Sequence, residues 1–130
     1  MALEIVIIDD DDDDIFILSE ALRTLDREVN IRAFSDSEDA CSHLFADKIN
    51  RPDFVFIDIN MPKILGPKCL AMVRANRDFD RTIVVMISTS MVDKDVIKLT
   101  GNGADFAVAK PASLSAYKSM LLKILTRRPD

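Results

Sequence analysis

The segment Phe54-Val55-Phe56-Ile57-Asp58 is a run of four apolar residues that ends in a carboxylate. Its lack of polar alternation predicts a strand that is covered on both faces, as in a parallel sheet flanked by helices. Three more apolar runs also end in polar side chains: Leu3–Ile8 before Asp9 and Asp10, residues 83–87 before Ser88, and Phe106–Ala109 before Lys110. If all four runs are parallel strands, these polar groups gather at the carboxyl edge of one sheet, where open α/β folds bind ligands.

Amphipathic patterns with helical spacing lie between the apolar runs, and a further short strand is expected over residues 30–34. The first predicted helix has Asp13 or Asp14 as N-cap and carries Leu18, Ala21, Leu22, Leu25 and Val29. The second begins at a capping box over residues 35–38 and reaches about Lys48, and the third runs from Pro67 to about Asn76. The fourth covers residues 93–100, and the fifth covers residues 114–125 with Ser113 as its cap. The expected fold is therefore α/β, a doubly wound five-stranded parallel sheet in the order 2-1-3-4-5 with five helices.

The composition is that of one globular domain, with 130 residues of which 48% are hydrophobic and 30% charged. We expect a single domain over residues 1–130 with no output domain. The net charge of −5 argues against direct nucleic-acid binding. The apolar runs are far shorter than the roughly 20 residues that a membrane span needs, and residues 1–8 show neither the basic n-region nor the cleavage site of a signal peptide. A cytoplasmic protein that contacts neither nucleic acid nor membrane is expected.

The cysteines and the single histidine do not form a recognisable metal or redox motif. Cys41 and Cys69 lack the paired spacing of a zinc site or of a C-x-x-C motif, so we expect both to be reduced packing residues. His43 has no second histidine or paired cysteine nearby in the sequence, which favours a structural or surface role.

The carboxylates at the strand ends carry the main chemical signal. In the predicted strand order the first and third strands are neighbours, so Asp9, Asp10 and Asp58 would crowd together. Two carboxylates about 5 Å apart repel by about 3 kcal/mol at an effective dielectric constant near 20, so the cluster needs a raised pKa or a metal ion. A hard cation with few protein carboxylates and several waters describes Mg²⁺, with Mn²⁺ as a substitute, better than Ca²⁺. Such a site suits phosphoryl transfer, with Asp58 as nucleophile and with Ser88 and Lys110 as partners of the phosphoryl oxygens.

These residues resemble the receiver domains of two-component response regulators, a family with a flavodoxin-like fold. The resemblance rests on Ile-Ile-Asp9-Asp10, Asp58-Ile-Asn-Met61-Pro62 followed by Gly66, Val-Met-Ile-Ser88 and Ala-Lys110-Pro111, in this order along nearly the whole chain. It implies that Asp9 and Asp10 bind Mg²⁺ together with Asp58 and the backbone carbonyl of Asn60. It also implies that Asp58 accepts a phosphoryl group, which Ser88 and Lys110 contact, and that the bond before Pro111 is cis.

The resemblance further implies a signalling protein rather than an enzyme, with activity limited to its own phosphorylation and dephosphorylation. The expected phosphodonor is a histidine kinase or a histidine phosphotransfer protein, and the output is a phosphorelay or contact with a downstream protein. Receivers commonly carry an aromatic switch residue three positions before the lysine, where this sequence has Ala107. Phe106 should point to the opposite side of its strand. We hypothesise that signalling here uses movement of Ser88 and Thr89 and of the loop that follows the fourth strand instead.

The acidic run continues beyond the pair at the end of the first strand. Asp12 to Asp14 are expected to form a solvated helix start, where acidic side chains favour the helix dipole. A functional alternative is that they raise the local Mg²⁺ concentration. An EF-hand is excluded because the loop glycine and the final glutamate are absent at the required spacing.

The first predicted helix has more apolar residues than one buried face needs, because Ile15, Phe16 and Ile17 cannot all face the sheet. An apolar patch beside the polar edge is a candidate docking surface for the helices of the phosphodonor. We expect Ile17, and with less support Phe16, to contact that partner. Packing beneath a loop is the alternative.

Two other functions use similar residues. A hydrolase of the haloacid-dehalogenase type also forms an aspartyl-phosphate, but its nucleophile would be Asp9, and it needs acidic residues after the lysine, where only Asp130 follows. A pseudo-receiver, which binds partners without turning over phosphate, would not need the complete set of chemical groups present here.

Overall fold

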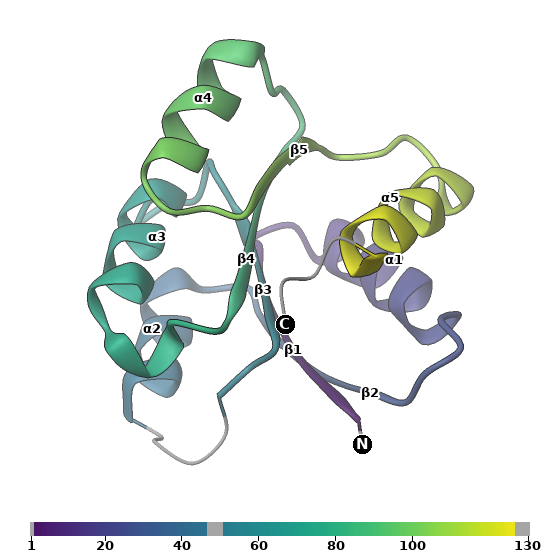
Figure 1. Ribbon diagram of the computed structural model, residues 1–130, viewed down its shortest axis with the longest axis horizontal. Coiled ribbons are helices and arrows are strands. Elements are labelled where there is room, and N and C mark those ends of the chain that lie inside the picture. The colour runs from purple at the N-terminus through teal and green to yellow at the C-terminus, as the bar shows by residue number, and fades with distance from the viewer. Residues whose placement is uncertain (1, 47–50, 127–130) are drawn as a thin grey trace.

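The computed structural model describes residues 2–46 and 51–126, which form one parallel five-stranded sheet in the order β2-β1-β3-β4-β5 (Figure 1). The elements follow the chain as β1 Leu3–Ile8, α1 Asp12–Arg23, β2 Val29–Phe34, α2 Ser37–Ala46, β3 Phe54–Asp58, α3 Gly66–Ala75, the 3-10 helix η1 Arg77–Phe79, β4 Ile83–Ser88, α4 Asp93–Gly101, β5 Phe106–Ala109 and α5 Leu114–Thr126. The fold class and strand order expected from the sequence are confirmed.

Helices cover both faces of the sheet, with α1 and α5 on one side and α2, α3 and α4 on the other (Figure 1). Alternate residues of each strand enter the two layers. In β3, Phe54 and Phe56 pack with α1 and α5, whereas Val55 and Ile57 pack with α2 and α3. Because every residue of β3 is buried, the strand has no polar face, which explains its uninterrupted apolar sequence.

Helix α1 begins earlier and ends earlier than its apolar spacing predicts. Asp11, rather than Asp13 or Asp14, is the N-cap, and its carboxylate accepts hydrogen bonds from the Asp13 and Asp14 amides at 2.9 and 3.3 Å. The helix ends at Arg23, and Val29 lies in β2, where it pairs with Leu3 of β1. The helical spacing of Val29 was therefore misleading, because strand pairing in the sheet overrides a local periodicity.

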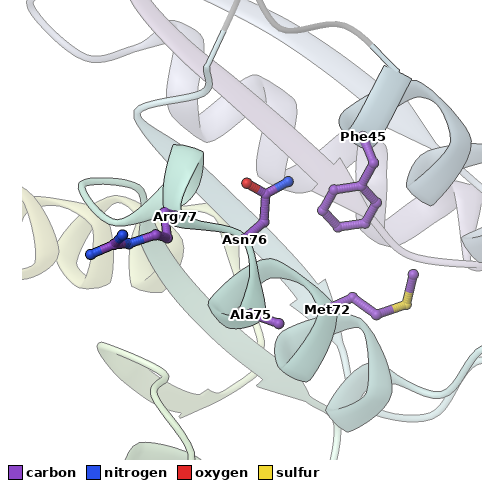
Figure 2. A pocket seen from close by; sticks show the side chains of 5 residues that line it. All are labelled: Phe45, Met72, Ala75, Asn76 and Arg77. Atoms are coloured by element: carbon purple, nitrogen blue, oxygen red, sulfur yellow. The ribbon is translucent and has the colours of Figure 1, made fainter.

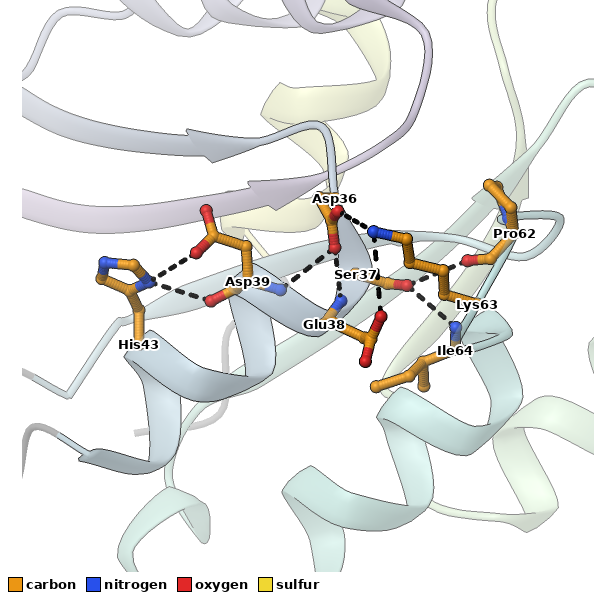
Figure 3. Close-up of polar contacts among 8 residues, drawn as sticks. All are labelled: Asp36, Ser37, Glu38, Asp39, His43, Pro62, Lys63 and Ile64. Carbon is orange, nitrogen blue, oxygen red and sulfur yellow. Dashed lines mark hydrogen bonds and ion pairs between the residues drawn. The ribbon is translucent and has the colours of Figure 1, made fainter.

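Helices α2 and α3 pack side by side and bring the two cysteines together. The α2 N-cap is Asp36, which accepts hydrogen bonds from the Glu38 and Asp39 amides at 2.9 and 3.1 Å (Figure 3). The predicted extension of this helix to Lys48 lies outside the described residues. Cys41 and Cys69 are buried, free thiols with their Sγ atoms 3.8 Å apart. Both fill the core as expected, but their proximity was not visible in the sequence spacing.

The predictions for the cap of α5 and for the two faces of β5 are confirmed. Ser113 caps α5 by accepting a hydrogen bond from the Ala116 amide at 3.1 Å. Ala107 and Phe106 lie on opposite faces of β5, as expected from the alternation of side chains along a strand.

The bond before Pro111 is trans, since residues 2–46 and 51–126 contain no cis peptide bond. The cis form expected from the resemblance is therefore wrong. The trans form is the lower in energy for most X-Pro bonds. No helix in the described part of the chain is long and apolar enough to cross a membrane.

Candidate functional site

The polar residues that follow the strands meet at the carboxyl edge of the sheet. Backbone pairing continues one step past β1 and β5, with the Asp9 amide bonded to the Phe34 carbonyl at 3.1 Å and the Lys110 amide bonded to the Ser88 carbonyl at 2.8 Å. These bonds fix the main chain at the residues that carry the polar side chains. The sheet therefore supplies a rigid edge from which carboxylates, a hydroxyl and an ammonium project.

Three carboxylates lie close enough together to share one cation. One oxygen from each of Asp9, Asp10 and Asp58 lies within 4.8 Å of the other two. Asp9 and Asp58 are buried and Asp10 is exposed, so the cluster opens to solvent on one side. Oxygens bound to one Mg²⁺ at about 2.1 Å lie at most about 4.2 Å apart. Since three ligands cannot all lie opposite one another, binding would draw the three carboxylates closer together, and they are hard oxygen donors of the kind that Mg²⁺ takes.

Lys110 provides the positive charge of the site. Its Nζ lies 2.9 Å from Asp9 Oδ2, 3.5 Å from Asp58 Oδ1 and 2.7 Å from Asp14 Oδ2. The Lys110 side chain is only 9% exposed, so these ionic contacts are poorly screened by solvent. The ammonium therefore partly neutralises a cluster of carboxylates that would otherwise repel one another.

Burial and mutual repulsion shift the ionisation of these groups. Burial, followed by the charge of Asp9, raises the pKa of Asp58 to about 6, although Lys110 partly offsets the shift. Burial also raises the pKa of Asp9, against the Asp11 amide hydrogen bond and the Lys110 contact. Burial alone would lower the pKa of Lys110, but hydrogen bonds to Asp14 and Asp9 raise it overall. The sequence predicted that the cluster would need a raised pKa or a metal ion, and the raised pKa is present.

Ser88 and Asn60 lie near the cluster in different environments. Ser88 is 1% exposed at the end of β4, one residue beyond Ile87, which pairs with Asp58. Its Oγ accepts a hydrogen bond from the Ser90 amide at 3.3 Å, which orients the hydroxyl oxygen. Asn60 is exposed, two residues beyond Asp58. A role for its carbonyl as a metal ligand stays a prediction.

The loop between β3 and α3 is held against α2 by polar contacts (Figure 3). The buried Ser37 hydroxyl donates to the Pro62 carbonyl and accepts from the Ile64 amide, each at 3.0 Å. Lys63, which has a left-handed φ of 68°, forms ion pairs with Asp36 and Glu38. His43 lies farther along α2 on the exposed surface, with Nδ1 2.9 Å from the Asp39 carbonyl. These contacts anchor the segment that follows Asp58, whereas His43 takes the surface role that the sequence favoured.

Gly66 brings the start of α3 against the backbone of Asp58. A Cβ atom at this position would lie 2.3 Å from the Asp58 carbonyl oxygen and 2.7 Å from Ile59 Cα. The Gly66 amide also donates to the Ile59 carbonyl at 3.0 Å. Glycine is needed here because the two main-chain segments approach too closely for any side chain.

Asp14 is the site residue that the sequence did not single out. It lies in the first turn of α1, where a solvated acidic residue was expected, yet its carboxylate makes the shortest of the three Lys110 contacts. Asp14 and Lys110 are 96 residues apart, so no local pattern links them. The one available hint was that Asp14 falls in the first turn of the helix that follows Asp9 and Asp10, near the polar edge of the sheet.

An apolar groove of about 610 Å³ lies elsewhere on the molecule, lined by residues from the ends of α2 and α3 and from η1 (Figure 2). Its lining residues are Phe45, Met72, Ala75, Asn76 and Arg77. None of them is an acidic residue, a cysteine or a histidine, so the groove offers no anionic ligand for a cation and no nucleophile that could accept a phosphoryl group. The carboxyl edge of the sheet is therefore the better candidate for chemistry.

The chain is similar to known proteins along most of its length. A sequence model of the response regulator receiver domain matches residues 5–122, which include every site residue named above. The transcriptional regulatory protein PrrA of Mycobacterium tuberculosis is 32% identical over 112 residues, covering 85% of this chain and 47% of PrrA. The chain thus spans about half the length of that relative.

Two solved structures have the same fold. The phosphorylated cyanobacterial phytochrome response regulator RcpA has a TM-score of 0.86 and 24% identity, with 98% of this chain and 94% of RcpA covered. The Mn²⁺-bound form of response regulator Rcp1 has a TM-score of 0.82 and 25% identity, with 96% and 93% covered.

Proposed function

The chain belongs to the response regulator receiver domain family, and on this basis we propose that Asp58 accepts a phosphoryl group from a phosphohistidine donor in a Mg²⁺-dependent step. Receiver domains are signalling domains of two-component systems and not classical enzymes. The observation that carries the proposal is the cluster at the sheet edge, where the buried Asp58 carboxylate lies beside Asp9, Asp10 and Lys110. The protein then signals through a phosphorelay or by contact with a downstream protein, in the cytoplasm.

The proposed transfer uses each residue in a separate role. An Asp58 carboxylate oxygen attacks the phosphorus in line, the bond to the donor imidazole nitrogen breaks, and the imidazole leaves with the electron pair and takes up a proton. Lys110 and the Ser88 hydroxyl bind the phosphoryl oxygens. Asp9, Asp10 and Asp58, with the Asn60 carbonyl, would hold the divalent cation. When bound, this cation supplies neutralisation of the charge that gathers on the phosphoryl group.

Two observations support a divalent cation at this position. The donors are three carboxylates with mutual oxygen distances within 4.8 Å, a set that suits hard cations such as Mg²⁺ or Mn²⁺. The related regulator Rcp1 has been solved in a Mn²⁺-bound form. In addition, Lys110 approaches the Asp58 carboxylate only to 3.5 Å, so one oxygen of that carboxylate remains available to the cation.

The proposed function is tested by the intact mass of the protein after incubation with acetyl phosphate and Mg²⁺. We expect one phosphoryl adduct, absent in Asp58→Ala and strongly reduced in Asp9→Ala or with EDTA. An adduct that survives Asp58→Ala but disappears in Asp9→Ala would instead support the hydrolase with Asp9 as nucleophile. If no adduct forms even with a phosphohistidine donor, the protein is a pseudo-receiver.

The surface of this chain that would contact the phosphodonor has one exposed aromatic residue on α1. Phe16 on α1 is 65% exposed, whereas Ile15 and Ile17 are partly buried against the layer formed by α1 and α5. The sequence ranked Ile17 ahead of Phe16, but the rotation of α1 turns Ile17 partly into the core. We therefore propose Phe16 as the main apolar contact with the phosphodonor, which is a histidine kinase or a histidine phosphotransfer protein.

Replacing Phe16 by aspartate is expected to slow phosphoryl transfer from the protein donor by about tenfold, because a charge would enter an apolar contact. Phosphorylation by acetyl phosphate should remain within about twofold of wild type, since Phe16 lies outside the cluster of site residues. Ile97→Asp is the matched control, because Ile97 is 73% exposed on α4, on the other side of the sheet (Figure 1). Equal effects of Phe16→Asp on both donors would contradict docking at this residue.

A further inference from the structure

We propose that Asp14 is a positioning residue for Lys110. The Asp14 carboxylate holds the Lys110 ammonium and so limits how strongly Lys110 can bind a phosphoryl group on Asp58. The inference rests on the proposed function of Asp58. It starts from the shortest ionic contact in the site, the 2.7 Å pair between Lys110 Nζ and Asp14 Oδ2. That pair links the first turn of α1 to the end of β5 across 96 residues.

The local structure of α1 fixes Asp14 in place. Its amide donates to the carboxylate of the N-cap Asp11 at 3.3 Å, which defines the start of the helix. Asp12 and Asp13 in the same turn are exposed, whereas the Asp14 side chain is 27% exposed and turned toward Lys110. A negatively charged side chain in this turn interacts favourably with the positive end of the helix dipole. Asp14 is therefore held in position as an ionic partner of Lys110, whereas its neighbours Asp12 and Asp13 are solvated.

The three distances at Lys110 rank its partners. The ammonium is 2.7 Å from Asp14, 2.9 Å from Asp9 and 3.5 Å from Asp58. A cation bound by Asp9 would weaken the hold of that carboxylate on the lysine, and Asp14 would remain as the competitor. Lys110 must then weaken its contact with Asp14 in order to bind a phosphoryl group on Asp58. This is costly because charge-assisted hydrogen bonds at this distance are stronger than neutral ones.

The position of Asp14 separates two effects of its charge. A carboxylate on the lysine reduces the positive charge available to a phosphoryl group, and it also repels the phosphoryl dianion at longer range. Asp13 is one residue away and exposed, with the same charge, so it shares the long-range effect without the contact to Lys110. Comparison of the two aspartates thus isolates the contribution of the contact.

The test measures binding of beryllofluoride, an analogue of the phosphoryl group, in the presence of Mg²⁺. Asp14→Asn is expected to lower the dissociation constant by about three- to tenfold, because it frees Lys110 while keeping the side-chain size. Asp13→Asn should change it by less than about twofold, since that side chain is screened by solvent. Asp14→Glu, which keeps the charge, should return binding toward that of wild type. Unfolding free energies of all variants serve as the check that each is folded.

Each outcome separates this inference from the proposed function. If wild type binds beryllofluoride but Asp14→Asn behaves like Asp13→Asn, the positioning role is wrong and the phospho-accepting function stands. Weaker binding by Asp14→Asn would also overturn the inference, because it would mean that Asp14 assists Lys110. If wild type and Asp58→Ala both fail to bind the analogue, the proposed function fails and this inference fails with it.

Discussion

Replacing Asp58 by asparagine is expected to raise the free energy of unfolding by about 2 kcal/mol at pH 8 in EDTA, despite the loss of a site residue. Burial and the neighbouring Asp9 raise the pKa of Asp58 to about 6, compared with about 3.9 in an unfolded chain. A shift of this size corresponds to about 3 kcal/mol. We reduce the expected gain because the variant also loses the 3.5 Å ionic contact to Lys110.

The sign of the effect fixes its dependence on pH. Because the folded state raises the pKa of Asp58, the wild type is relatively stable while this carboxyl is protonated and loses stability as the pH rises from about 4 to about 6. Asparagine resembles the protonated form at every pH. The stability difference between the variant and wild type should therefore be less than about 1 kcal/mol at pH 4 and reach its full size above pH 6.

Urea unfolding of wild type and Asp58→Asn at pH 4 and pH 8 measures this difference. Asp80→Asn is the matched control, since Asp80 is exposed and its replacement changes the net charge by the same amount. Excess Mg²⁺ should reduce the advantage of Asp58→Asn, because a ligand stabilises the folded state that binds it better. An unfolding free energy for Asp58→Asn equal to or below that of wild type at pH 8 would show that the site does not disfavour the Asp58 charge.

Gly66→Ala is expected to lower the free energy of unfolding by about 3 kcal/mol, the upper end of the usual cost of overpacking. The added Cβ would lie 2.3 Å from the Asp58 carbonyl oxygen and 3.0 Å from its carbonyl carbon. These are main-chain atoms of a strand that pairs with β1 and β4, so they cannot move aside independently of the sheet. Relief of the clash must instead shift α3 or the backbone of Asp58.

The same substitution should slow phosphoryl incorporation from acetyl phosphate by about tenfold or more, because misplacement of a reacting group by about 1 Å is costly. Gly101→Ala is the control, since a Cβ at that position would meet no atom within 4 Å beyond its chain neighbours and the backbone of its own helix. Gly101 is the last residue of α4, where alanine should leave the stability unchanged or raise it by up to about 1 kcal/mol. Equal stabilities for Gly66→Ala and Gly101→Ala would contradict the close approach at Gly66.

The strands and the position of the site could be predicted because the apolar runs and the polar residues that end them are local features, and the doubly wound fold class supplied the strand order. The uninterrupted apolar run before Asp58 indicated a strand buried on both faces, and all residues of β3 are buried. The polar residues that end β1, β3, β4 and β5 then had to lie on one edge, since all strands are parallel. The approximate helix bounds followed from caps and periodicity, except where strand pairing placed Val29 in β2.

Contacts between elements could not be predicted in the same way. The Cys41 and Cys69 sulfurs meet only because α2 and α3 pack against each other, and Phe16 is exposed instead of Ile17 because of the rotation of α1. The Asp14 contact with Lys110 needs the start of α1 and the end of β5 to converge.

Patterns a few residues long predicted the buried strands, the approximate helices and the five polar residues at the strand ends, whereas the strand order followed from the doubly wound fold class and the family resemblance. The raised pKa of Asp58, about 6, and the ion pair between Lys110 and Asp14, one of six consecutive aspartates, arise only in the folded chain. Those properties depend on burial and on distances between side chains far apart in the chain, and these are fixed by packing of the helices on the sheet.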